Sequence, residues 1–125
     1  MQFCMMMAAR VAACNHNVIY IDIGNGGFNA QRLCEIYQRR YPDAPLTALD
    51  RIRVVRCFDI YQTLAALDRH QDQDRQLRLV IVDCVGAALM PIMTGSQRSR
   101  QLTQHLQSIL SFYAKQRHIA VLVNH

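Results

Sequence analysis

The sequence predicts an α/β domain with a mainly parallel sheet and helices on both of its faces. Strand-like and helix-like segments alternate along the whole chain, and helical crossovers between strands favour parallel pairing. Residues 79–82 (L-V-I-V) are apolar at both alternating positions, which is typical of a central strand buried on both faces. Asp83 ends this run abruptly, at the position where open α/β sheets bind ligands. Many buried strands also end in an aspartate that only begins the next turn.

The first third of the chain contains a helix, a strand and a glycine-rich turn. Gln2–Cys14 is rich in small residues and apolar nearly all round, so we expect a buried helix packed on the sheet. Val18–Ile23 (V-I-Y-I-D-I) is rich in β-branched residues and predicts a strand with an acid, Asp22, near its end. Gly24–Gly27 follows as a turn.

The middle of the chain repeats this order. Ala30–Tyr41 predicts a helix, and the two prolines of residues 42–45 end it. Ile52–Cys57 is a strand whose partial alternation indicates less burial than its neighbours. Ile60–Arg69 is a helix with Asp59 as its N-cap.

The last third begins with the apolar strand Leu77–Asp83 and continues with the irregular segment Gly86–Gly95. A long amphipathic helix is predicted over Gln97–Gln116, with Ser96 as its N-cap. Ile119–Val123 is the last predicted strand.

Length and composition fit one domain over residues 1–125, with 51% hydrophobic residues for a core. No apolar run approaches the roughly 18 residues that a membrane span needs. The N-terminal segment lacks a basic start and is interrupted by Arg10, which favours a buried helix over a signal peptide. Five cysteines without a C-x-x-C pair argue against a zinc ribbon or a disulfide framework, and most are expected to be buried.

Charge is distributed unevenly, because no acid follows Asp83. Four basic residues in that part, Arg98, Arg100, Lys115 and Arg117, supply most of the net charge of +5. A cationic segment of this kind favours a polyanionic partner, most simply nucleic acid. A solvated basic helix face is the alternative explanation.

Several short motifs occur in a familiar order: Y-I-D-x-x-x-G-G at 20–27, F-D-I-Y-Q at 58–62, L-V-I-V-D at 79–83 and V-N-H at 123–125. On these motifs the chain resembles the RecA/Rad-type recombinases, and most nearly the D-type eukaryotic DNA-repair recombinase paralogues. The resemblance spans Gln2 to His125. It implies a RecA-like P-loop NTPase core, truncated at both ends.

The family's phosphate-binding loop, G-x-x-x-x-G-K-[ST], precedes the first helix in these proteins. This sequence contains no such motif, and Met1 stands where its last residue would be. The loop supplies backbone N–H groups and a lysine to the phosphates and a hydroxyl to Mg²⁺. ATP and Mg²⁺ are therefore implied by the family, while the sequence lacks the loop that binds most of the phosphate.

The resemblance also assigns roles to single residues. Asp83 takes the place of the Walker B acid that holds Mg²⁺. Asn124 and His125 take the place of the polar strand tip that senses the γ-phosphate. Asn25 stands near the position of the family's catalytic glutamate, and an amide can hydrogen-bond the attacking water but cannot accept its proton.

The segment Gly86–Arg100 corresponds to the family's first DNA-facing loop. Arg98 and Arg100 are therefore candidate phosphate contacts. Alternatively, both arginines are solvated at the start of a helix, where the dipole disfavours them.

Three hypotheses for function follow. The first is a nuclear recombinase paralogue that acts in DNA repair by homologous recombination, together with other paralogues and DNA and without a membrane. The second is a scaffold or interaction module that keeps the RecA-like fold but neither binds ATP by itself nor hydrolyses it. The third is an unrelated flavodoxin-type or regulatory α/β domain, which would not explain the ordered motifs.

Overall fold

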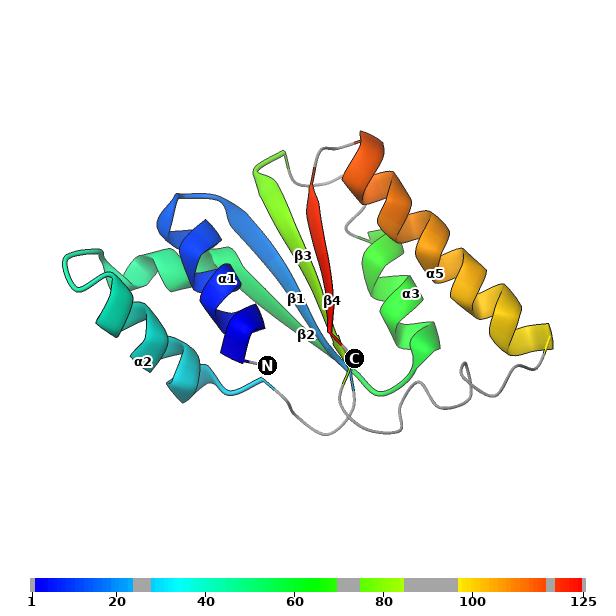
Figure 1. Ribbon diagram of the computed structural model, residues 1–125, viewed down its shortest axis with the longest axis horizontal. Coiled ribbons are helices and arrows are strands. Elements are labelled where there is room, and N and C mark those ends of the chain that lie inside the picture. The colour runs from blue at the N-terminus through cyan, green and yellow to red at the C-terminus, as the bar shows by residue number, and fades with distance from the viewer. Residues whose placement is uncertain (1, 24–27, 70–74, 85–96, 117–118, 125) are drawn as a thin grey trace.

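A computed structural model describes residues 2–23, 28–69, 75–84, 97–116 and 119–124 of the chain. It shows a parallel sheet with helices on both faces, which confirms the predicted fold class (Figure 1). In chain order the elements are α1 (Gln2–Ala13), β1 (Asn17–Ile23), α2 (Ala30–Arg40), the 3-10 helix η1 (Leu46–Arg51), β2 (Ile52–Cys57), α3 (Ile60–Arg69), β3 (Leu77–Cys84), α5 (Gln97–Gln116) and β4 (Ala120–Asn124).

Every predicted helix and strand is present, and the observed ends differ from the predicted ones by at most one residue. The short helix η1 was not predicted. Its start is held by a tertiary contact, because the Tyr37 hydroxyl donates a hydrogen bond to the Pro45 carbonyl oxygen (2.7 Å). The segment Gly86–Gly95 and the predicted cap Ser96 lie outside the described residues.

The described strands are all parallel and lie in the order β2-β1-β3-β4. β1 and β3 are the inner strands, and the apolar run Leu79–Val82 is buried throughout, as the sequence predicted. β2 lies at the edge of this sheet, and its Arg53 and Arg56 are exposed. This position explains the partial alternation of that strand.

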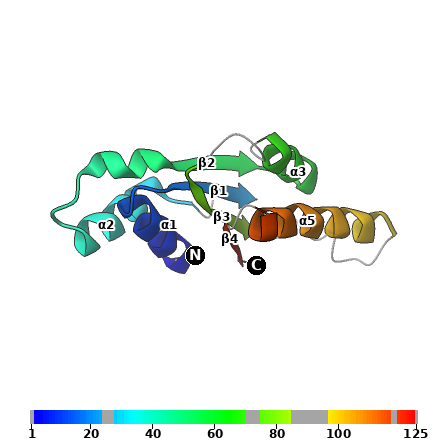
Figure 2. The same ribbon diagram turned by 90° about the horizontal axis from the view of Figure 1, so that it is seen from above.

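Two hydrophobic clusters cover the two faces of the sheet. Helices α1 and α2 lie over one face, and α3 and α5 lie over the other (Figures 1 and 2). The first cluster contains small, aromatic and sulfur-containing side chains, such as Ala9, Tyr20 and Met5. The second is mostly aliphatic, and the Tyr113 hydroxyl of α5 joins α3 through the Leu67 carbonyl oxygen (2.6 Å).

The first helix differs from its prediction, because only one side of α1 is buried. Ala8, Ala9 and Ala12 face the core, and their small side chains let the helix approach the sheet closely. Phe3 is 58% exposed and Arg10 is also exposed. A helix that is apolar nearly all round was expected to be buried all round, and this part of the expectation is wrong.

Side-chain caps begin two of the helices. The Asn29 side chain accepts a hydrogen bond from the Arg32 N–H at the start of α2 (3.1 Å). At the start of α3 Asp59 accepts one from the Gln62 N–H (2.9 Å), and Gln62 in turn accepts one from the Phe58 N–H (2.6 Å). The predicted cap at Asp59 is confirmed, and the reciprocal bonds give F-D-I-Y-Q a structural role as a capping motif.

Of the four cysteines that the structure describes, Cys4 and Cys57 are buried, Cys14 is exposed and Cys34 is intermediate. The expectation that most cysteines are buried is therefore met by half of these four. Within the described ranges, no helix combines the length and the apolar character that crossing a membrane requires.

Candidate functional site

The carboxyl ends of the strands gather at one edge of the sheet (Figure 1). Two acids meet there, because Asp22 of β1 is the register partner of Asp83 of β3. Residues that pair in a parallel ladder project to the same face, and this face is the one that α1 and α2 cover. Both acids are almost completely buried, at 1% and 0% exposure. The prediction that the two strand-end acids lie side by side is confirmed.

Tyr20 holds the Asp83 carboxylate. Its hydroxyl donates a hydrogen bond of 2.6 Å to Asp83 Oδ2. Tyr20 pairs with Ile81, so Asp83 is its diagonal neighbour on the same face of the sheet. Burial, followed by the hydrogen bond to Asp83 and the charge of that carboxylate, raises the pKa of Tyr20 well above its ordinary value. The phenol therefore stays protonated and remains a donor to Asp83.

The chain returns to Asp22 after residues 24–27. The Phe28 N–H donates to Asp22 Oδ2 over 3.4 Å. The Phe28 ring packs edge-on against the Tyr20 ring, with centroids 5.0 Å apart and planes at 61°. This aromatic pair shields the two carboxylates from the side of α2 and fixes the Tyr20 ring.

The first turn of α1 approaches the same edge of the sheet, where Figure 1 shows the amino end of this helix. Cys4 lies in that turn, and burial and then the negative charge of Asp83 raise the pKa of its thiol. The N–H groups of a first helical turn lack intrahelical partners and carry partial positive charge. The edge thus combines two carboxylates with a helix end that favours anions, which is the usual arrangement for a phosphate with its cation.

The other predicted site residues are placed only in part. Asn124 is the register partner of Asp83 in β4, so the fold brings it to the same edge. Arg98 and Arg100 lie in the first turn of α5, and this helix covers the opposite face of the sheet from the acids. Asn25 and His125 lie outside the described residues. The roles assigned to these residues remain predictions.

Sequence reasoning assigned no role to Tyr20. One signal was available, because position 20 lies two residues before Asp22 and so shares its face of the strand. A tyrosine in an otherwise aliphatic buried strand also needs a partner for its hydroxyl. The identity of that partner depended on the pairing of β1 with β3.

Asp22 and Asp83 suit one mode of magnesium binding. Mg²⁺ is usually held by one or two carboxylates together with water and substrate phosphates. Among the residues that the structure describes, no group of three or more His, Cys, Asp or Glu could hold a metal ion. The pair therefore fits a shared protein–phosphate site and not a cage made by protein ligands alone.

Parallel strands, helices on both faces and paired acids at the carboxyl edge beside a helix amino end define a RecA-like core. The chain belongs to the Rad51 family, whose model matches residues 2–125.

Known proteins of this class are similar to the chain over nearly its whole length. It is 39% identical to the DNA repair protein RAD51 homolog 4 of Bos taurus and 36% identical to that of Mus musculus, over 99% of this chain in both cases. The chain spans 42% and 41% of the length of these two relatives. The crystal structure of the RadB recombinase shares the fold, with a TM-score of 0.75 and 24% identity, over 96% of this chain and 54% of that one.

Replacing Tyr20 with phenylalanine tests the hydrogen bond to Asp83. We expect Tyr20→Phe to lower the free energy of unfolding at pH 7 by about 1.5–3 kcal/mol, because a buried carboxylate loses a donor. Urea unfolding measures this. The matched control is Tyr41→Phe, since the partly buried Tyr41 hydroxyl has no hydrogen bond among the described residues, and its loss is expected to stay within about 0.5 kcal/mol.

The pH dependence gives the same variant a second readout. Above about pH 10 the unfolded chain loses the phenol proton while folded Tyr20 keeps it, so stability falls by up to about 1.4 kcal/mol per pH unit. Tyr20→Phe removes this part of the decline. A shallower decline from about pH 9 remains, because burial also raises the pKa of Cys4 and Cys57. Identical alkaline slopes in the two proteins would contradict the assignment.

Proposed function

We propose that this chain is part of a recombinase paralogue that acts in the nucleus in DNA repair by homologous recombination. The observation that carries the proposal is the 39% identity to RAD51 homolog 4 of Bos taurus over 99% of the chain. That relative is called a DNA repair protein. The preserved core and the buried pair Asp22 and Asp83 support the same role.

Within this role, we assign nucleotide binding to the carboxyl edge of the sheet. Asp83 holds Mg²⁺ when ATP is bound, and Asp22 beside it adds negative charge that a cation offsets. Mg²⁺ supplies charge neutralisation at the phosphates. Tyr20 fixes the Asp83 carboxylate through its hydrogen bond. Asn25 positions water without accepting a proton.

Two further contacts belong to this proposal. Asn124 and His125 contact the γ-phosphate from the end of β4, and the pairing of Asn124 with Asp83 supports this placement. Arg98 and Arg100, in the first turn of α5, contact the DNA backbone. Other recombinase paralogues are the protein partners, in keeping with the family.

A second function is favoured by one observation, the lack of a G-x-x-x-x-G-K-[ST] motif in this sequence. In this alternative the chain is an interaction module that keeps the RecA-like fold without binding ATP by itself. The loop's backbone N–H groups and lysine supply most contacts to the phosphates, so their loss removes most of the affinity.

A chimeric protein tests the repair role. The matched segment of RAD51 homolog 4 of Bos taurus is replaced by this chain, and the chimera is expressed in cells that lack their own copy. We expect it to restore homologous recombination in a reporter assay, because the core residues and strand ends are equivalent. Failure of a folded chimera would refute the assignment. Asp83→Ala in the chimera reports whether the acid takes part.

Calorimetry with MgATP separates the two functions for the chain itself. We expect binding weaker than millimolar, since the phosphate loop is lacking. Micromolar binding that Asp83→Ala abolishes would instead show that the chain holds the nucleotide without that loop and would exclude the scaffold alternative.

DNA binding gives a separate test of the arginines at the start of α5. We expect weak binding whose logarithm falls with the logarithm of salt concentration, and Arg98→Ala with Arg100→Ala reduces this slope by about 0.7 per lost contact on a single strand. Lys115→Ala is the control, since Lys115 is exposed in the last turn of the same helix. An unchanged slope in the double variant would exclude the phosphate contacts.

A further inference from the structure

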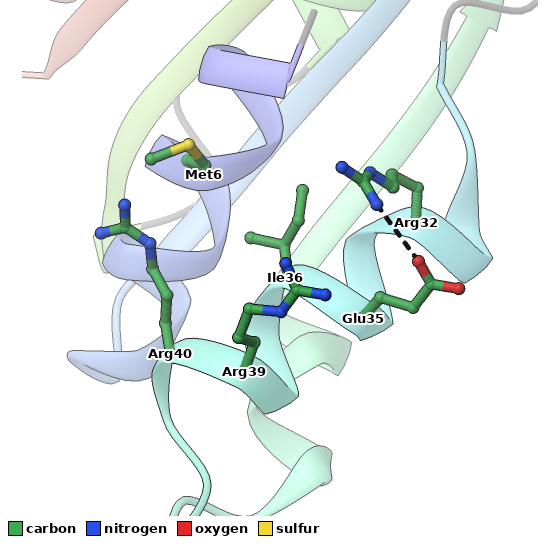
Figure 3. A pocket seen from close by; sticks show the side chains of 6 residues that line it. All are labelled: Met6, Arg32, Glu35, Ile36, Arg39 and Arg40. Carbon is green, nitrogen blue, oxygen red and sulfur yellow. Dashed lines mark hydrogen bonds and ion pairs between the residues drawn. The ribbon is translucent and has the colours of Figure 1, made fainter.

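A groove with a volume of about 160 Å³ lies between α1 and α2, away from the paired acids. Met6 is its only lining residue from α1, and the other five come from α2 (Figure 3). Its lining residues are Met6, Arg32, Glu35, Ile36, Arg39 and Arg40. The groove thus has an apolar floor and a charged rim.

The rim carries an excess of positive charge. Arg32 and Glu35 form an ion pair of 3.4 Å in which both side chains are about half exposed, so these two charges offset each other. Arg39 and Arg40 are exposed, and no acid within the described ranges lies at ion-pair distance from them. Their position in the last turn of α2 suits the helix dipole but does not neutralise them. The groove therefore presents two available cations to a partner.

The floor is suited to one apolar side chain. Met6 and Ile36 form it, and Met7 and Phe3 continue the apolar surface along the outward side of α1. A cavity of similar volume accepts a benzene-sized group. Methionine adapts its shape to different partners and is common on surfaces that bind peptides.

We propose that this groove docks an acidic segment of a partner protein. One large apolar side chain of the segment lies on Met6 and Ile36, and neighbouring carboxylates pair with Arg39 and Arg40. This inference goes beyond the proposed function and does not rest on nucleotide or DNA binding by the chain.

The same features disfavour nucleic acid as the occupant. The Glu35 carboxylate is part of the wall, only 3.4 Å from Arg32, and would repel a phosphate that approached this arginine. The apolar floor offers no donor to a phosphate. A peptide uses both parts, because arginine and buried apolar anchors together supply most of the binding energy at protein interfaces.

Fluorescence anisotropy with a labelled peptide of alternating Glu and Leu, twelve residues long, tests the proposal on the full chain. We expect Arg39→Glu with Arg40→Glu to weaken binding at least tenfold at 150 mM salt. The neutral pair Arg39→Ala with Arg40→Ala gives a second variant that does not oppose the helix dipole, and a loss of at least threefold is expected. Lys115→Glu, in the last turn of α5 on the other face, is the matched control and is expected to change binding less than twofold.

Charge exchange supplies a rescue. A peptide with Lys in place of Glu is expected to bind the Arg39→Glu, Arg40→Glu variant at least tenfold more tightly than the unchanged chain. Replacing the peptide's leucines with serine is expected to weaken binding at least fivefold, which reports on the apolar floor. Circular dichroism confirms that each variant keeps its helices.

Three outcomes would overturn the proposal. The first is equal binding of the acidic peptide by the charge-reversed and unchanged chains. The second is failure of the charge exchange to restore binding. The third is displacement of the peptide by a 20-nucleotide single-stranded DNA whose own binding is lost on reversal, which would assign the groove to nucleic acid.

Discussion

The register between β1 and β3 is the constraint on which the site depends. It aligns Asp22 with Asp83 and places Tyr20 one diagonal step from the second acid. A slip of one residue would send one acid to the face that α3 and α5 cover, because side chains alternate along a strand. Apolar packing on both faces opposes such a slip, since it would expose or misplace every buried residue of the strand. The chemistry of the edge is therefore fixed by the packing of the core.

The order of elements could be predicted because its causes are local. Apolar residues at both parities in Leu79–Val82 identify a strand buried on both faces, and the alternation of helices and strands implies parallel pairing. Parallel pairing alone places the strand-end acids together. The partner of Tyr20 could not be predicted in this way, because Asp83 lies 63 residues further along the chain and the contact needs the register.

Two other features show the same limit. The pattern of α1 contains too many apolar residues to reveal which side packs on the sheet, so the exposure of Phe3 became clear only from the fold. The helix η1 depends on the contact between Tyr37 and Pro45, which a local pattern does not contain. In contrast, the cap at Asp59 follows from neighbours in sequence and was predicted correctly.

The position of the paired acids within the sheet has a consequence for local opening. Asp22 and Asp83 belong to the two inner strands of the described sheet, whose amide and carbonyl groups have ladder partners on both sides. Fluctuations of a folded chain begin where fewest such partners hold the backbone. Separation of an outer strand, β2 or β4, therefore leaves the bond between Tyr20 and Asp83 in place. Its amides would be among the last to exchange with solvent.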